Sequence, residues 1–144
     1  MTPKELFLEG MRLNDGGDHD AFLAIQAREA VWTVPGAELH GVDEIRSWLE
    51  VFWHAFSTFR HDLTNVAEHG DSVFAEGVWT GVNDGPVETP AGEAPATGRE
   101  ISFPFAVVVE VDRERDQVRA VRLYFDQLGF LAQLGVIPEP AAAA

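Results

Sequence analysis

The chain has 144 residues, of which 46% are apolar, enough for one compact domain. Its formal net charge of −14 repels phosphate backbones and anionic lipids, so we expect neither a nucleic-acid partner nor membrane binding. Cysteine is absent, which excludes disulfides, thiolate metal sites and a cysteine nucleophile. Neither a signal-peptide pattern nor a bilayer-length apolar run occurs, so we expect a cytoplasmic location.

The first half of the chain is predicted to be mainly helical. Pro3 suits the first turn of a helix. Asp18 suits the N-cap of a second, short helix over residues 19–27. The clearest helix covers residues 43–59, with Asp43 as its N-cap, because its apolar residues recur at helical spacing along one stripe.

The second half is predicted to be β-structure. On a strand over residues 100–111, Phe103, Phe105 and Val107 alternate onto one face. Helices followed by mostly antiparallel strands indicate an α+β domain over residues 1–137, with a curved sheet around the long helix and two shorter N-terminal helices. The mouth of such a cone suits a small hydrophobic ligand. The predicted strands are residues 31–34, 61–68, 72–82, 100–111 and 117–126.

Two segments are predicted to be irregular. Residues 84–99, with proline and glycine spaced throughout, form a loop, and residues 138–144 form a flexible tail. Between the last strand and this tail, a short helix over residues 130–134 is expected to end at Gly135.

Apolar residues on both faces of the predicted sheet favour a homodimer. Val108 points away from Phe105 and Val107 on the same strand, while the helices can cover only one sheet face. We therefore expect the outer face to pack against a second copy of the chain.

Asp126 is the main candidate for a catalytic residue. It ends an apolar strand on which Arg122, Tyr124 and Asp126 alternate onto one face. Partial loss of hydration beside a phenol would make its carboxylate a better base. The alternative is a helix cap, in which Asp126 accepts hydrogen bonds from free backbone N–H groups of residues 128–134.

Five further residues are candidates for ligand binding. Arg122 could be the ionic partner of the catalytic carboxylate or an ordinary exposed arginine. Trp32 and Trp79 could line an aromatic pocket or belong to the core. Tyr124 and Asn83 could hydrogen-bond substrate oxygens, although Asn83 also suits a turn. No metal-binding spacing, phosphate loop or nucleophile elbow occurs and the five histidines are scattered, so we expect no metal and no cofactor.

The run Tyr-Phe-Asp-Gln-Leu-Gly-Phe-Leu-Ala-Gln-Leu-Gly, over residues 124–135, resembles the C-terminal signature of the SnoaL-like polyketide cyclases. In that signature an Asp is followed three residues later by a Gly, and then by Gln-Leu-Gly. Weaker matches at residues 41–46, 78–81 and 98–103 extend the resemblance over nearly the whole chain. The resemblance implies the nuclear-transport-factor-2-like (NTF2-like) cone, with a hydrophobic cavity and a homodimer through the sheet.

The resemblance also implies a reaction. An Asp at the position of Asp126 is the acid/base of an intramolecular aldol ring closure in these cyclases, on a polycyclic aromatic substrate and without a cofactor. A helpful histidine of the cyclases is missing, and Val107 lies near its place; Val82 and Asn83 stand where a second one is usual.

Two alternatives to the cyclase stay open. The missing histidines favour a non-catalytic ligand-binding or dimerisation module of the same fold. A hydrolase like limonene epoxide hydrolase would need an Asp-Arg-Asp set, of which Asp126 and Arg122 supply two members. The ketosteroid isomerase branch resembles the chain less, because Val34 stands where its base would be.

Overall fold

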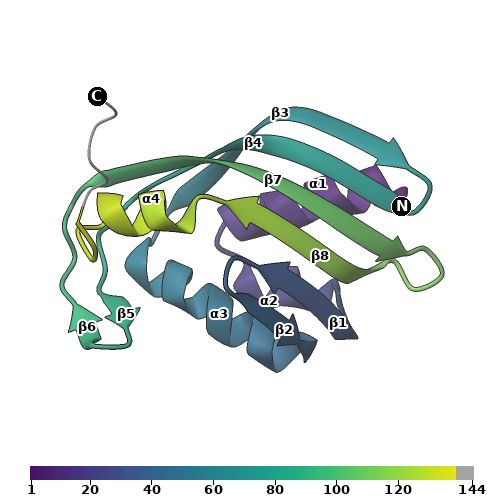
Figure 1. Ribbon diagram of the computed structural model, residues 1–144. Coiled ribbons are helices and arrows are strands. Elements are labelled where there is room, and N and C mark those ends of the chain that lie inside the picture. The colour runs from purple at the N-terminus through teal and green to yellow at the C-terminus, as the bar shows by residue number, and fades with distance from the viewer. Residues whose placement is uncertain (139–144) are drawn as a thin grey trace.

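Figure 1 shows the computed structural model, which describes residues 1–138; the predicted tail, beyond Pro138, lies outside the described residues. Within residues 1–138 the chain forms four α-helices and eight β-strands. No helix of this described part is long and apolar enough to cross a membrane. The helices are α1 (Pro3–Asp15), α2 (His19–Ala24), α3 (Gly41–Ala55) and α4 (Gln127–Gln133). The strands are β1 (Gln26–Val34), β2 (Ala37–His40), β3 (Phe59–His69), β4 (Ser72–Val82), β5 (Val87–Thr89), β6 (Gly92–Ala94), β7 (Glu100–Asp112) and β8 (Gln117–Phe125).

Six strands form one curved sheet in the order β2-β1-β8-β7-β4-β3. Neighbouring strands are antiparallel except β1 and β8, which run parallel. The sheet arches over α1, α2 and α3, which lie on its concave side (Figure 1). β5 and β6 pair separately as a small hairpin. The predicted α+β fold with a curved, mostly antiparallel sheet is confirmed.

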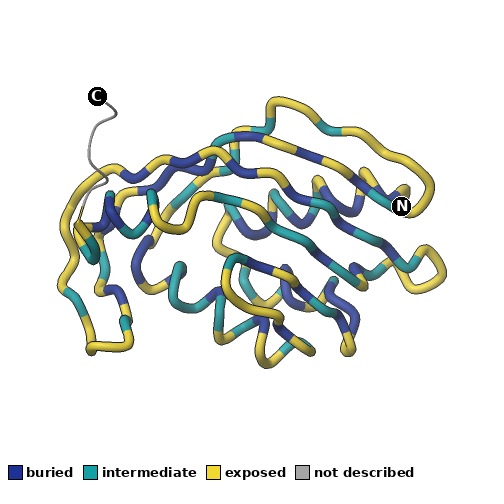
Figure 2. The backbone as a smooth tube through the Cα atoms, viewed as in Figure 1, coloured by how far each residue is buried: buried dark blue, intermediate teal, exposed yellow. Residues whose placement is uncertain are grey.

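Alternation along β7 separates the inside of the fold from the outside. Its residues are buried at every second position, and Figure 2 shows dark blue alternating with lighter colours along the strands. Burial of one large apolar side chain contributes about 1.5–3 kcal/mol, which exceeds the ~1 kcal/mol span of strand propensities. The inward-facing residues of β7 are Ile101, Phe103, Phe105, Val107, Val109 and Val111.

The first strands of the sheet extend further than the sequence predicts. β1 begins at Gln26 and not at residue 31, because pairing with β8 extends it. The helix predicted over residues 19–27 accordingly ends at Ala24. β2 has no counterpart among the predicted strands; it returns along β1 through a tight turn at Gly36, whose φ of 78° favours glycine.

The long helix begins and ends earlier than the predicted residues 43–59. Its N-cap is His40, which makes no side-chain capping bond. Asp43 is therefore not the N-cap; it lies in the first turn, where its charge complements the helix dipole. Phe59 belongs to β3, because it pairs with Gly81 of β4. Sheet pairing overrides the helical spacing at this end.

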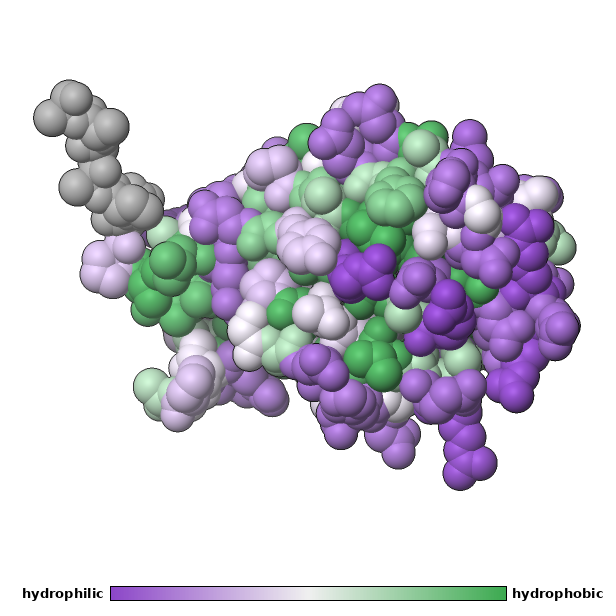
Figure 3. Space-filling model, turned by 45° about the vertical axis from the view of Figure 1, so that its right-hand side comes forward, coloured by the Kyte–Doolittle hydropathy of each residue, from purple (hydrophilic) through white to green (hydrophobic). Residues whose placement is uncertain are grey.

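The outer face of the sheet exposes apolar side chains. Phe74 on β4 is 46% exposed and lies beside Val108 of β7, and Tyr124 on β8 is 53% exposed. In Figure 3, apolar residues (green) are exposed across the middle of the molecule among hydrophilic ones (purple). These side chains lie where the sequence predicts the homodimer contact, which stays a prediction.

We expect the protein to sediment as a dimer at micromolar concentration. Phe74→Asp should shift it toward the monomer, because the new carboxylate would lose its hydration in the contact. The matched control is Leu8→Asp, which changes a similarly exposed (40%) apolar residue on α1. A wild-type protein that sediments as a monomer would contradict the prediction.

Candidate functional site

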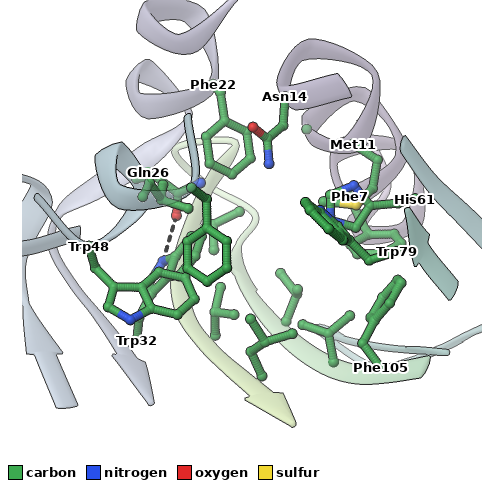
Figure 4. A pocket seen from close by; sticks show the side chains of 18 of the residues that line it. Phe7, Met11, Asn14, Phe22, Gln26, Trp32, Trp48, His61, Trp79 and Phe105 are labelled. Atoms are coloured by element: carbon green, nitrogen blue, oxygen red, sulfur yellow. Dashed lines mark hydrogen bonds between the residues drawn. The ribbon is translucent and has the colours of Figure 1, made fainter. Parts of the chain in front are cut away.

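A pocket of about 110 Å³ lies between the concave face of the sheet and the helices α1, α2 and α3 (Figure 4). Of the described residues, 24 make its wall, and nearly all are apolar or aromatic. Apart from tryptophan, only Asn14, Gln26 and His61 among residues 1–138 bring polar side chains to it. These three side chains, which come from α1, β1 and β3, decide what chemistry the pocket can support.

Asp15 holds the His61 ring. The Nδ1 atom of His61 lies 2.6 Å from Asp15 Oδ1, and the His61 backbone N–H donates to Asp15 Oδ2 at 3.0 Å. Phe59 and Phe105 meet the imidazole edge to face, at centroid distances of 5.9 and 5.3 Å. Because the carboxylate takes the Nδ1 side, Nε2 is the ring nitrogen left for a ligand, and in the neutral ring with its proton on Nδ1 it carries the lone pair.

Asp15 is an unfavourable residue for the end of a helix. A carboxylate at a helix C-terminus meets the negative end of the helix dipole and the free carbonyl groups of the last turn. The two hydrogen bonds from His61 offset this repulsion, since a bond to a charged group contributes about 1.5–3 kcal/mol. The pairing with His61 gives this residue a specific task, which is to fix the orientation and tautomer of the imidazole.

Asn14 and Gln26 are held by tryptophan. The Nε1–H group of Trp53 donates to Asn14 Oδ1, and that of Trp32 donates to Gln26 Oε1, each at 3.1 Å. Asn14 is only 6% exposed and Gln26 only 4%. In the view of Figure 4, Asn14 points into the pocket between Gln26 and His61, which lie on opposite sides.

Two of the residues predicted to bind a ligand, Trp32 and Trp79, line the pocket. Trp79 is stacked against Phe59 and Phe103, at centroid distances of 5.7 and 4.9 Å. Both tryptophans are buried, so each belongs to the core and to the pocket wall. Within residues 1–138, no group of three or more His, Asp or Glu side chains is placed to hold a metal ion.

Arg122 and Tyr124 lie on the outer face of the sheet. Their side chains share a face, as alternation predicts, but β8 turns Leu123 and Phe125 into the pocket instead. Arg122 Nη1 donates to Glu110 Oε2 at 2.9 Å, and the Tyr124 side chain is exposed. Neither side chain lines the pocket.

Asp126 caps α4, which begins at Gln127 and not at the predicted residue 130. Its Oδ1 accepts a hydrogen bond from the Gly129 backbone N–H at 2.9 Å, and the residue is exposed and does not line the pocket. A Cβ at position 129 would lie 2.5 Å from Asp126 Oδ2, so a larger residue there would require this carboxylate to shift. The bond favours the cap interpretation; a catalytic role of Asp126 stays a prediction.

The rest of the C-terminal signature also has a structural task. The Gln133 amide donates to the Ser102 carbonyl oxygen at 2.8 Å and accepts from the Ser102 N–H at 3.0 Å. It thereby continues the hydrogen bonding of β7 where β8 has ended. Gly135 has a φ of 75°, in the left-handed region that commonly ends a helix.

Asn83 is completely buried away from the pocket. Its Nδ2 donates to the carbonyl oxygens of Ala55 and Gly85, each at 3.0 Å. Its Oδ1 accepts from the Thr97 N–H at 2.8 Å. Asn83 therefore ties both ends of residues 84–99 to the end of α3, as a turn residue does.

His61, Asp15, Asn14 and Gln26 are not among the site residues predicted from sequence. A sequence pattern could have identified His61. It lies two residues from both Phe59 and Leu63, and this alternation places it on the inward face of β3. Its partner, Asp15, is 46 residues away along the chain, and no spacing pattern predicts that pairing.

A family model described as the SnoaL-like domain matches residues 7–121. The chain belongs to the SnoaL-like domain family. The match ends at residue 121, so the whole C-terminal signature, residues 124–135, lies outside it. None of the curated proteins compared with this SnoaL-like domain matches it.

Solved structures share the SnoaL-like fold, and identities below 25% establish the fold alone. AclR, a candidate hydroxylase from Streptomyces galilaeus, has a TM-score of 0.80 and 17% identity, covering 97% of this chain and 85% of its own. A candidate SnoaL-like polyketide cyclase from Jannaschia sp. CCS1 has a TM-score of 0.79 and 19% identity, covering 94% and 93%. A protein with a ketosteroid isomerase-like fold from Catenulispora acidiphila DSM 44928, in complex with trimethylamine, has a TM-score of 0.72 and 20% identity, covering 94% and 95%.

The cap at Asp126 predicts a specific pattern of stability. We expect Asp126→Ala to lower the free energy of unfolding by about 1 kcal/mol and Asp126→Asn to lower it much less, because Asn caps nearly as well as Asp. Urea unfolding of the two variants measures the difference. If Asp126→Asn lost catalytic turnover while its free energy of unfolding stayed unchanged, the catalytic interpretation would be supported instead.

His19 adds a pH dependence to the wall of the site. Its ring stacks on Trp53 with centroids 3.8 Å apart, and burial lowers the pKa of His19 below its ordinary value, against the opposing charge of Asp20. The unfolded chain therefore binds a proton more readily than the folded one, and this part of the stability is lost as the pH falls through about 6.5.

We expect the wild type to lose more unfolding free energy between pH 7.5 and pH 5.5 than the variant His19→Gln, which cannot take up this proton. Urea unfolding at the two pH values measures both losses. Equal losses in the two proteins would contradict the prediction.

Proposed function

We propose that this SnoaL-like domain binds a small, mainly apolar carbonyl compound in the pocket and acts on it by acid/base catalysis with His61. The observation that carries the proposal is the 2.6 Å contact between Asp15 and His61 Nδ1 at the wall of an otherwise apolar pocket. Histidine is the most frequent general acid/base, because its charge changes near neutral pH. The structural likeness to a candidate polyketide cyclase supports the reaction class.

The proposed reaction is an intramolecular aldol ring closure, with His61 in the role that the resemblance gives to Asp126. Nε2 takes a proton from a carbon next to a carbonyl group, and the electron pair of that C–H bond forms an enolate. The enolate carbon attacks a second carbonyl carbon of the same molecule, which forms a C–C bond and an alkoxide. The alkoxide then takes the proton from Nε2–H, so atoms and charge balance within one molecule.

Asp15 and the aromatic wall support this cycle in different ways. Asp15 keeps the proton on Nδ1 and faces the imidazolium that forms when Nε2 is protonated. The stacked rings of Trp79 and Phe103 offer a flat apolar wall for an aromatic substrate. Such a wall holds the two reacting carbons together and replaces a random encounter with a positioned one.

The size of the pocket favours a small ligand. Its volume of about 110 Å³ is less than that of the cavity of about 150 Å³ which binds benzene in a well-studied case. In this form the pocket suits a ligand with about one aromatic ring, and not the larger polycyclic compound that the resemblance implies.

The first step of the reaction can be tested without knowing the natural substrate. We expect the wild type to catalyse exchange of the methyl hydrogens of acetophenone for deuterium in D₂O, followed by proton NMR. His61→Gln should lower that rate by about 10²–10⁴-fold, because the base is removed. Asp15→Asn should lower it less, since the base remains but its orientation is weakened.

The matched control is His69→Gln, which changes an exposed histidine on the same strand and should leave the exchange rate unchanged. Binding of acetophenone, followed by tryptophan fluorescence, should survive in His61→Gln. A wild type that binds acetophenone without exchange would contradict the catalytic proposal and favour a non-catalytic binding module.

A further inference from the structure

The two tryptophan–amide pairs determine which way the buried amides face. An indole N–H can only donate, so its partner must be the carbonyl oxygen of the amide. Trp53 therefore identifies Oδ1 of Asn14, and Trp32 identifies Oε1 of Gln26. In each amide the NH₂ group must then point away from the indole.

Both NH₂ groups are open to the pocket. Among residues 1–138 neither amide nitrogen has a protein acceptor, and no buried side-chain N or O atom in that range is both unpartnered and inaccessible. Asn14 and Gln26 are more than nine-tenths buried and line the pocket, so the accessible part of each NH₂ group faces it. Figure 4 shows the Asn14 side chain pointing into this space.

Two such donors in an apolar pocket require acceptor atoms on the ligand. A buried N–H group without a partner is unfavourable, so an occupant that brings oxygen acceptors is bound more tightly than one of the same shape without them. No Lys or Arg of the described chain lines the pocket, and the net charge of −14 opposes anions. The chemistry therefore selects a neutral acceptor, such as a ketone, over a carboxylate or a phosphate.

We propose that Asn14 and Gln26 form an oxygen-binding pair that selects neutral aromatic ketones and stabilises their enolates. The inference rests on the proposed function for treating the pocket as the substrate site. When His61 removes the proton next to the carbonyl group, negative charge develops on the carbonyl oxygen. Hydrogen bonds to that charged oxygen are stronger than bonds to the neutral ketone, so the same donors lower the barrier.

The test compares acetophenone with α-methylstyrene, which has the same shape but carries C=CH₂ in place of C=O. We expect the wild type to bind acetophenone about 5- to 30-fold more tightly, as one or two hydrogen bonds provide. Asn14→Asp and Gln26→Glu keep the acceptor for Trp53 and Trp32 but replace the NH₂ group by oxygen. Each should remove most of the ketone preference while α-methylstyrene binds as before, measured by NMR titration.

Because a buried carboxyl group could unfold the protein, Asn14→Leu and Gln26→Met provide a second pair without charge. Thermal melting checks each variant, and α-methylstyrene binding checks the shape of the pocket. Equal affinity of the wild type for both compounds would overturn the inference. An unchanged ketone preference in all folded variants would overturn it as well.

His61→Gln separates this inference from the proposed function, because it should lower the exchange rate by about 10²–10⁴-fold and keep the ketone preference. A ketone preference in a wild type that shows no exchange would remove the role of His61 and leave the oxygen-binding pair. Exchange in a wild type that shows no ketone preference would keep the role of His61 and remove the oxygen-binding pair.

Discussion

The inward row of β7 is the constraint on which the rest of the structure depends. Side chains on a strand alternate with a period of two, so a slip of one residue would turn the whole apolar row toward solvent. Every second residue of β7 from Ile101 to Val111 faces the helices. The pairing registers then decide which residues of β4 and β8 also face inward. Trp79 and Phe125 thereby reach the pocket, while Arg122 and Tyr124 are held on the outer face.

The polar side chains of the pocket are all fixed in the same way, by a hydrogen-bond partner. Asn14 and Gln26 are buried and His61 is half-buried, and each is fixed by a partner from another part of the chain: Asp15 for His61, Trp53 for Asn14 and Trp32 for Gln26. A buried polar group without a partner is unfavourable. A polar group with a single fixed partner keeps its remaining hydrogen-bond donor or acceptor in a defined direction. In the proposed site, this arrangement would offer a ligand a lone pair and two NH₂ groups that need no rearrangement.

The C-terminal signature illustrates the difference between recognising a fold and locating a site. Asp126, Gly129, Gln133 and Gly135 all have structural explanations: a cap, the N–H group that the cap accepts from, a link to Ser102 and a helix end. A motif can therefore resemble a family correctly while its residues also have structural roles, and the catalytic role of Asp126 stays a prediction. Function has to be derived from the groups that meet in space.

The sequence alone determined the fold class, because the apolar stripe of α3 and the alternation of β7 are local patterns with periods that only one element type satisfies. It also marked Asp126 as either a base or a cap, and Trp32 and Trp79 as either pocket or core residues. Element ends such as Gln26 and Phe59 could not be predicted, since pairing with distant strands set them. Only the tertiary structure decided the site: it brought Asp15 to His61 across 46 residues and Trp53 to Asn14 across 39, and no local period encodes such contacts.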